Sequence, residues 1–190
     1  MNITDLLRRL DNLIRLGTIA AVDHQAARCT VSSGGLRIPN LPWLVLRAGA
    51  SSDWDPPTVG EQCLLLSPSG EPAQGIALIG LYSQQRPAPS NSATLRRRTY
   101  PDGAVIDYDH ASHTLTATLP DGGKAKITAT GGLHVIGPIL HEGDYTQTGN
   151  QNVTGTVTVT EDVIAGEISL VNHRTKGVTP GNGTSLEPTP

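Results

Sequence analysis

Aromatic residues are scarce in this 190-residue sequence, which contains two Trp, four Tyr and no Phe. Proteins that bind single-stranded nucleic acid usually stack bases on aromatic side chains. The chain also has no excess of positive charge, because 14 Lys and Arg stand against 17 Asp and Glu. Binding to phosphate backbones needs a basic surface. The composition therefore argues against a dedicated nucleic-acid-binding protein, although a barrel of the OB type that binds nucleic acid remains an alternative.

Cysteine and long apolar runs are also scarce. Cys29 and Cys63 each lie in an apolar context, and we expect two buried thiols, with a disulfide as the alternative. The sequence has no run of about 20 apolar residues, the length of a membrane-spanning helix. It also lacks the basic, apolar and small-residue pattern of a signal peptide. We therefore expect synthesis in a cytoplasm and, for any role outside the cell, delivery by another route.

Catalytic motifs are missing as well. No Ser or Cys lies in a nucleophile elbow, and no glycine-rich loop is suited to holding phosphate. The densest polar cluster consists of Asp107, Asp109, His110 and His113. A metal or acid–base site is one interpretation of this cluster, and a solvated hairpin that uses such residues in its turn is the one we adopt. The sequence predicts a protein that is not an enzyme.

What the sequence does contain is a six-residue repeat between residues 143 and 172. Its successive units are GDYTQT, GNQNVT, GTVTVT, EDVIAG and EISLVN. Because side chains alternate faces along a strand, Val153, Val157 and Val159 fall on one face and threonines on the other. A short, fixed period is typical of a β-helix or a related fibrous β structure.

A single copy of this repeat is not expected to order itself. Its apolar side chains are too few to offset the conformational entropy lost by a segment of that length. An isolated strand would also leave its backbone N–H and C=O groups without partners. Identical chains wound together supply both a valine core and strand pairing, and closed cyclic symmetry is the usual arrangement of identical chains. We therefore predict an intertwined homotrimer, in which the energetics require several chains but do not fix their number at three.

The chain divides into five predicted parts. They are an N-terminal helix, an OB-fold barrel, a linker or collar, a β-helical shaft and a tip, at residues 1–17, 18–85, 86–99, 100–172 and 173–190. The helix itself is predicted over 4–16, with Thr4 as its N-cap and an apolar stripe that packs on its own domain or docks on a partner. Short strands separated by turns predict the five-stranded barrel, with candidates at 18–22, 28–32, 36–38, 43–46, 62–67 and 76–82. Further short strands are predicted over 104–108, 114–119, 124–129 and 133–136. The run Arg96–Arg98 is interpreted as a solvated collar or as a source of inter-chain salt bridges, with a patch that binds phosphate or acidic lipid as the alternative.

Several blocks of the sequence resemble one known family. They are LPWLVLRAG, WDPPTVGEQCLLLSPSGE, GIALIGLYS, YPDGAVIDYDHASHTLT, the six-residue repeat and NHRTKGV. In these blocks the chain resembles baseplate assembly protein V, the central spike of contractile-tailed phages and R-type pyocins. The resemblance implies an all-β chain whose N-terminal OB-fold docks to the baseplate hub and tail-tube proteins. A trimeric, triple-stranded β-helix with a pointed C-terminal tip would follow.

The resemblance also implies a function. Sheath contraction would drive the spike through the outer membrane of a bacterial target, without enzymatic activity. The particle would be assembled in the bacterial cytoplasm and released by lysis. A trimeric fibre that binds a receptor or glycan is one alternative. An OB-fold that binds a sugar, on which Trp43 or Trp54 would stack, is another. The sequence has no aromatic residue after Tyr145, which favours piercing over recognition at the tip.

Members of the family often carry a His-x-His pair at the tip, where three chains hold one iron ion with six imidazoles. In this sequence His173 takes the first position, but Thr175 takes the second. Three copies of His173 about a threefold axis would supply three nitrogens, a donor set suited to iron, zinc or nickel. We therefore name His173 as the candidate metal ligand and iron as the candidate metal. A His173 that only packs or hydrogen-bonds at the tip is the alternative.

Overall fold

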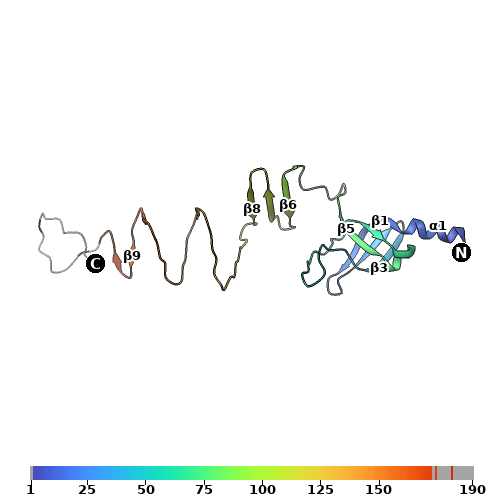
Figure 1. The fold of residues 1–190 in the computed structure, drawn as a ribbon, viewed down its shortest axis with the longest axis horizontal. Coiled ribbons are helices and arrows are strands. Elements are labelled where there is room, and N and C mark those ends of the chain that lie inside the picture. The colour runs from blue at the N-terminus through green and yellow to red at the C-terminus, as the bar shows by residue number, and fades with distance from the viewer. Residues whose placement is uncertain (1, 173, 175–180, 182–190) are drawn as a thin grey trace. The chain divides into compact units, whose positions relative to one another are not determined.

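The computed structural model describes residues 2–172, 174 and 181 and shows a mostly β chain with one α-helix among them (Figure 1). The chain forms two compact units, Met1–Thr128 and Ala129–Pro190. No helix in the described part of the chain is long and apolar enough to cross a membrane.

Helix α1 spans Ile3–Asn12 and is shorter than the sequence predicted. Its N-cap is Asn2, whose side-chain Oδ1 accepts a hydrogen bond from the Thr4 N–H at 3.1 Å, so the predicted cap at Thr4 was wrong. The helix ends before Ile14 because residues from there pair with another strand. Tertiary pairing overrides the helical periodicity that continues through this stretch.

A five-stranded antiparallel barrel follows the helix, as predicted. Its strands lie in the order β3-β2-β1-β4-β5, and their bounds are β1 Ile14–Asp23, β2 Arg28–Ser33, β3 Leu36–Leu41, β4 Gln62–Leu66 and β5 Ile76–Leu81. The segment after β3 closes the barrel onto β5, because the Leu44 N–H donates to the Ala77 carbonyl and the Ala77 N–H donates to the Pro42 carbonyl, each at 2.9 Å. The strand predicted over 43–46 is reduced to a single bridge at Trp43.

The barrel encloses the hydrophobic core of the chain. The core residues come from all five strands and are Ile19, Cys29, Val31, Ile38, Leu41, Cys63, Leu65 and Ala77. Both cysteines are buried free thiols, which confirms the sequence prediction. Burial is the main reason that the pKa of Cys63 is raised to about 11, with smaller effects from Cys29 and Glu61.

Two short 3-10 helices, η1 Pro68–Gly70 and η2 Pro72–Gln74, connect β4 to β5. Gly70 has a φ of +69°, and a Cβ at this position would overlap the backbone of Arg9 in α1. Glycine is therefore required both for the local backbone conformation and for the close approach of the helix.

A second sheet, of three antiparallel strands in the order β6-β7-β8, completes the first unit. Its strands are β6 Leu95–Thr99, β7 Val105–Asp109 and β8 Thr114–Thr118. The last two were predicted, whereas β6 lies in the stretch interpreted as a linker or collar. Three consecutive arginines are not typical of a strand. Here Arg97 forms an ion pair with Asp107 on β7, which stabilises β6 in the sheet.

The second unit contains one strand ladder among its described residues. It joins β9, Ile164–Ala165, to β10, Ile168–Ser169. The strands predicted over 124–129 and 133–136 do not form in this single copy. From residue 121 to residue 172, every residue is exposed except the half-buried Asp162 and Ser169. This stretch therefore has no hydrophobic core of its own.

Candidate functional site

The repeat segment is the first candidate, and its glycines share one backbone conformation. Gly143, Gly149 and Gly155, which begin the first three units, have φ values of +108°, +114° and +137°. Gly137 lies six residues before the first of them and has a φ of +127°. The six-residue period therefore begins at Gly137, one unit earlier than the sequence predicted. The signal that would have revealed this unit is the glycine itself, six residues before Gly143 and at the position where the backbone turns. Figure 1 shows this part of the chain as extended arms joined by reversals.

The valine face of the repeat is open to solvent in a single copy. Val153, Val157, Val159 and Val163 are all at least 43% exposed. Exposed apolar surface of this kind is typical of interaction sites.

A hairpin organised by Asp162 follows the valines. The Asp162 carboxylate accepts hydrogen bonds from the Val163 N–H at 2.8 Å and from the Val171 N–H at 3.1 Å. A hydrogen bond with Ser169 is the largest cause of the lowered pKa of Asp162, followed by the bond from Val171. In its charged form, the Asp162 carboxylate therefore stabilises the turn directly before the predicted tip.

The candidate metal ligand His173 lies outside the described residues, as does Thr175. Among the residues that are described, no three His, Cys, Asp or Glu side chains gather closely enough to hold a metal ion. The tip metal therefore stays a prediction from the sequence.

The polar cluster of β7 and its turn is a hairpin. The Asp107 carboxylate accepts two hydrogen bonds from the Arg97 guanidinium, at 2.6 and 2.9 Å, and they are the main cause of its lowered pKa. Asp109 accepts from the Ala111 N–H at 2.9 Å, which is the main cause of its lowered pKa. His113 adopts the left-handed conformation with a φ of +55°. Pairing and turn geometry therefore account for these residues.

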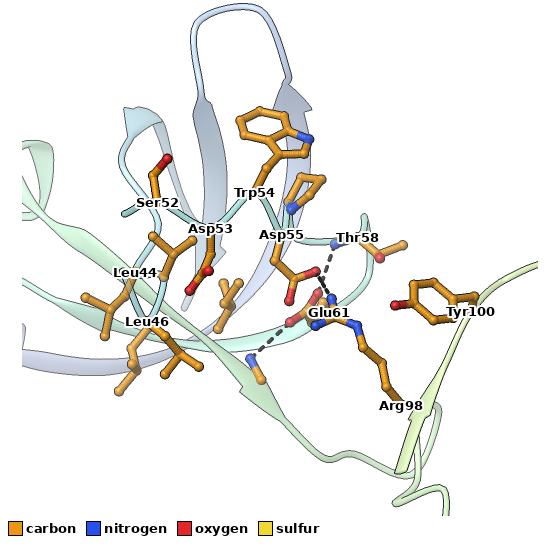
Figure 2. Close-up of a pocket in the computed structure, with 15 residues that line it drawn as sticks. Leu44, Leu46, Ser52, Asp53, Trp54, Asp55, Thr58, Glu61, Arg98 and Tyr100 are labelled. Atoms are coloured by element: carbon orange, nitrogen blue, oxygen red, sulfur yellow. Dashed lines mark hydrogen bonds and ion pairs between the residues drawn. The ribbon is translucent and has the colours of Figure 1, made fainter. Parts of the chain in front are cut away.

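A groove of about 780 Å³ lies between the barrel and β6 (Figure 2). Trp54, which is 60% exposed, makes an edge contact with the half-buried Trp43 at a centroid distance of 5.7 Å. The Arg98 Nη2 atom lies 2.6 Å from Asp55 Oδ1 at the mouth of the groove. The arginine run therefore makes contacts within one chain, at Arg97 and Arg98, rather than forming only a solvated collar.

The groove has an apolar and acidic lining. Leu44 and Leu46 contribute exposed side chains beside Asp53 and Asp55. The Glu61 carboxylate is held by the Thr58 and Gly80 N–H groups at 2.9 and 3.0 Å. A lining with solvent-exposed leucines suits contact with another protein chain.

Comparisons with known proteins agree with this architecture. Residues 15–82, which hold nearly all of strands β1–β5, match the family described as the type VI secretion system/phage-baseplate injector OB domain. Over 140 residues the chain is 42% identical to the spike protein of Escherichia phage P2. The alignment covers 73% of this chain and 65% of the P2 protein, so the chain spans just under two thirds of that relative. The resemblance drawn from the sequence is confirmed: residues 15–82 match the phage-baseplate injector OB domain family, and the chain is similar to a phage spike protein.

Proposed function

We propose that this chain is the structural central spike of a contractile tail or pyocin, a homotrimer that punctures the outer membrane of a target cell. The observation that carries the proposal is the stretch from residue 121 to residue 172, in which no apolar side chain is buried in a single copy. Backbone and valines alike need partners from outside the segment. Two further copies wound around the same axis would supply them as a triple-stranded β-helix.

The composition of the repeat suits mechanical penetration. It contains no Lys or Arg between Asp144 and Asn172, and threonines occupy the face opposite the valines. Short side chains on the outer face keep the shaft narrow. Each strand of an intertwined shaft is bound to other chains, so local fraying would require partial dissociation of the trimer.

The barrel would serve as the base that joins the spike to the baseplate hub and tail tube. Its core of buried residues gives a rigid body. The exposed Leu46 and Trp54 beside the groove offer apolar contacts to such a partner. The particle would be assembled in the bacterial cytoplasm and released by lysis.

A metal at the tip is part of the proposal. Three His173 imidazoles about the axis would hold one iron ion and crosslink the chain ends. Elemental analysis of the purified protein is expected to find one iron per three chains, and His173→Ala is expected to lose it. Iron at trace level in the native protein would remove the metal and leave the shaft unaffected.

Particles test the piercing function directly. A producer strain that lacks this chain is complemented either with the full chain or with a version that ends at residue 142. With the full chain, contraction on sensitive cells is expected to admit a fluorescent dye that the intact outer membrane excludes. With the shortened chain, contraction without dye entry is expected. Equal dye entry with the two chains would contradict the proposal.

Absence of catalysis is tested separately on the purified protein. Incubation with peptidoglycan, lipopolysaccharide or denatured protein is expected to release no fragments above a boiled control. Release that depends on time and on the amount of chain would identify an enzyme.

A further inference from the structure

Helix α1 has an unusual orientation on the barrel, with its apolar face turned outward. The one buried residue of the helix is the polar Asn12. The apolar side chains of the helix and of the turn into β1 are all exposed, from 39% to 74%, and they are Ile3, Leu6, Leu7, Leu10, Leu13 and Ile14. Amphipathic helices normally bury such a stripe against their own domain. We call these six residues the α1 stripe.

Polar contacts hold the helix in this orientation. The Arg15 guanidinium donates to Asn12 Oδ1 at 2.9 Å and to Ser33 Oγ at 3.1 Å, which joins the end of the helix to β2. The Ser67 N–H donates to the Leu13 carbonyl at 2.8 Å. The α1 stripe is therefore presented on a fixed support rather than on a loose terminus.

The spacing of the α1 stripe indicates what covers it. With Ile3 at position a of a heptad, the other stripe residues of the helix, Leu6, Leu7 and Leu10, fall at d, e and a, and the helical C-cap Leu13 falls at d. Ile14 is the first residue of β1 and takes no heptad position. A seam of a and d alone suits a two-stranded coiled coil, whereas an added e position widens the apolar face for a helix that contacts more than one neighbour. The charged residues lie outside the stripe, and Asp5 forms ion pairs with both Arg8 and Arg9 at 2.8 and 3.0 Å.

We propose that the α1 stripe is covered by α1 of the other copies, so that three N-terminal helices form a short bundle. This inference rests on the proposed homotrimer. Six side chains of this kind offer an apolar patch on the order of a few hundred Å², below the roughly 800 Å² per partner of a standard interface. The patch is too small to hold free copies together. Copies already joined through the shaft meet at a high effective concentration, where a small interface is sufficient.

The bundle would give the trimer a second interface between its chains, at the other end of the sequence from the shaft. A ten-residue helix alone is marginal in water, so the bundle is expected only in the full chain. Disulfide crosslinking of the full chain tests this. Leu10→Cys places a thiol in the α1 stripe, and Asp11→Cys, one residue along and outside the stripe, is the matched control. The native thiols do not interfere, because Cys29 and Cys63 are at most 2% exposed.

Mild oxidation of dilute Leu10→Cys protein is expected to give a two-chain product, with one chain of each trimer left over, and Asp11→Cys is expected to stay single-chain. The yield from Leu10→Cys should not change on further dilution. A trimeric mass by light scattering together with equal crosslinking of the two variants would overturn the bundle alone. A monomeric mass would overturn both the proposed trimer and the bundle.

Discussion

The barrel buries its apolar side chains within one chain, whereas the repeat segment leaves them exposed in one chain. Leu65 in the barrel is 0% exposed, whereas Val157 in the repeat is 66% exposed. Each barrel strand pairs with neighbours from the same chain, but the described part of the second unit forms one ladder of two residues per strand. The barrel is thus a folding unit of one chain, whereas the described part of the repeat has no core within one chain.

The difference shows that similar apolar residues carry different information in the two regions. In the barrel, an apolar side chain on one face of a strand predicts a contact within the chain. In the repeat, the same alternation predicts a contact between chains. Mutations should therefore act on unimolecular stability in the first region and on association in the second.

Replacement of a repeat valine should have the largest effect. Val157→Asp would bring three carboxylates to one level of the trimer core, where each unpaired buried charge costs about 3–5 kcal/mol. We expect loss of the trimer, measured as a shift to monomer by size-exclusion chromatography with light scattering.

The matched control is the neighbouring residue on the opposite face. Thr158→Asp adds the same charge outside the predicted core and is expected to leave the trimer intact. Equal effects of the two substitutions would contradict the assignment of faces.

Truncation in the barrel core comes next. Leu65→Ala removes a fully buried side chain and should lower the free energy of unfolding of the first unit by about 2–5 kcal/mol. Denaturant titration of the full chain, followed by Trp fluorescence, measures this, since both tryptophans lie in that unit. The midpoint should not depend on protein concentration. A strong dependence would show that the barrel, too, requires association to fold.

A smaller effect is expected where α1 meets the barrel. Gly70→Ala forces alanine into a left-handed conformation and against the Arg9 backbone, and the backbone strain alone costs on the order of 1–3 kcal/mol. Gly80→Ala shares the positive φ, +89°, but has no atom within 4 Å of the added Cβ. Thermal melting should place Gly70→Ala below Gly80→Ala. Identical melting temperatures would mean that α1 does not rest on Gly70.

The smallest predicted effect is the pH dependence of the β6–β8 sheet. Arg97 holds the pKa of Asp107 below its usual value, chiefly by donating hydrogen bonds to its carboxylate. A depressed carboxyl pKa stabilises the folded state above the unfolded pKa of about 3.9. This contribution is lost as the pH falls below about 4 and through the folded pKa.

Acidification from neutral pH should therefore lower the melting temperature less in Asp107→Asn than in the native chain. The control is Asp53→Asn, since no hydrogen bond or ion pair of the Asp53 side chain is found among the described residues. A native-like acid response in Asp107→Asn would exclude the Arg97 pair as its source.

Sequence reasoning predicted the barrel well because local and tertiary signals agree there. Turn residues separate short apolar strands, and the buried Cys29 and Cys63 fall where apolar context placed them. It failed where a tertiary contact overrode the local pattern. Ile14 continues the helical stripe in sequence but pairs with Leu66 in β4. Arg96–Arg98 form a strand in which Arg97 forms an ion pair with Asp107 and Arg98 with Asp55.

The predictions of the candidate sites were also correct where local contacts decide the structure and incomplete where tertiary contacts decide it. The hairpin interpretation of Asp107 and Asp109 was correct, since turn chemistry is local. The exposed α1 stripe was visible as amphipathicity, but its outward orientation depends on the contacts of Asn12 and Arg15. No sequence pattern records such contacts. The repeat was recognised from its period, and its first unit at Gly137 was missed because that unit lacks the valine and threonine alternation.

The mass of the full chain in dilute solution tests the central claim most directly. Size-exclusion chromatography with multi-angle light scattering is expected to give three times the 19.9 kDa mass of one chain, unchanged on tenfold dilution. A mass of one chain at the same concentrations would contradict the account, because a single copy offers the described repeat no core and a single ladder of two residues per strand.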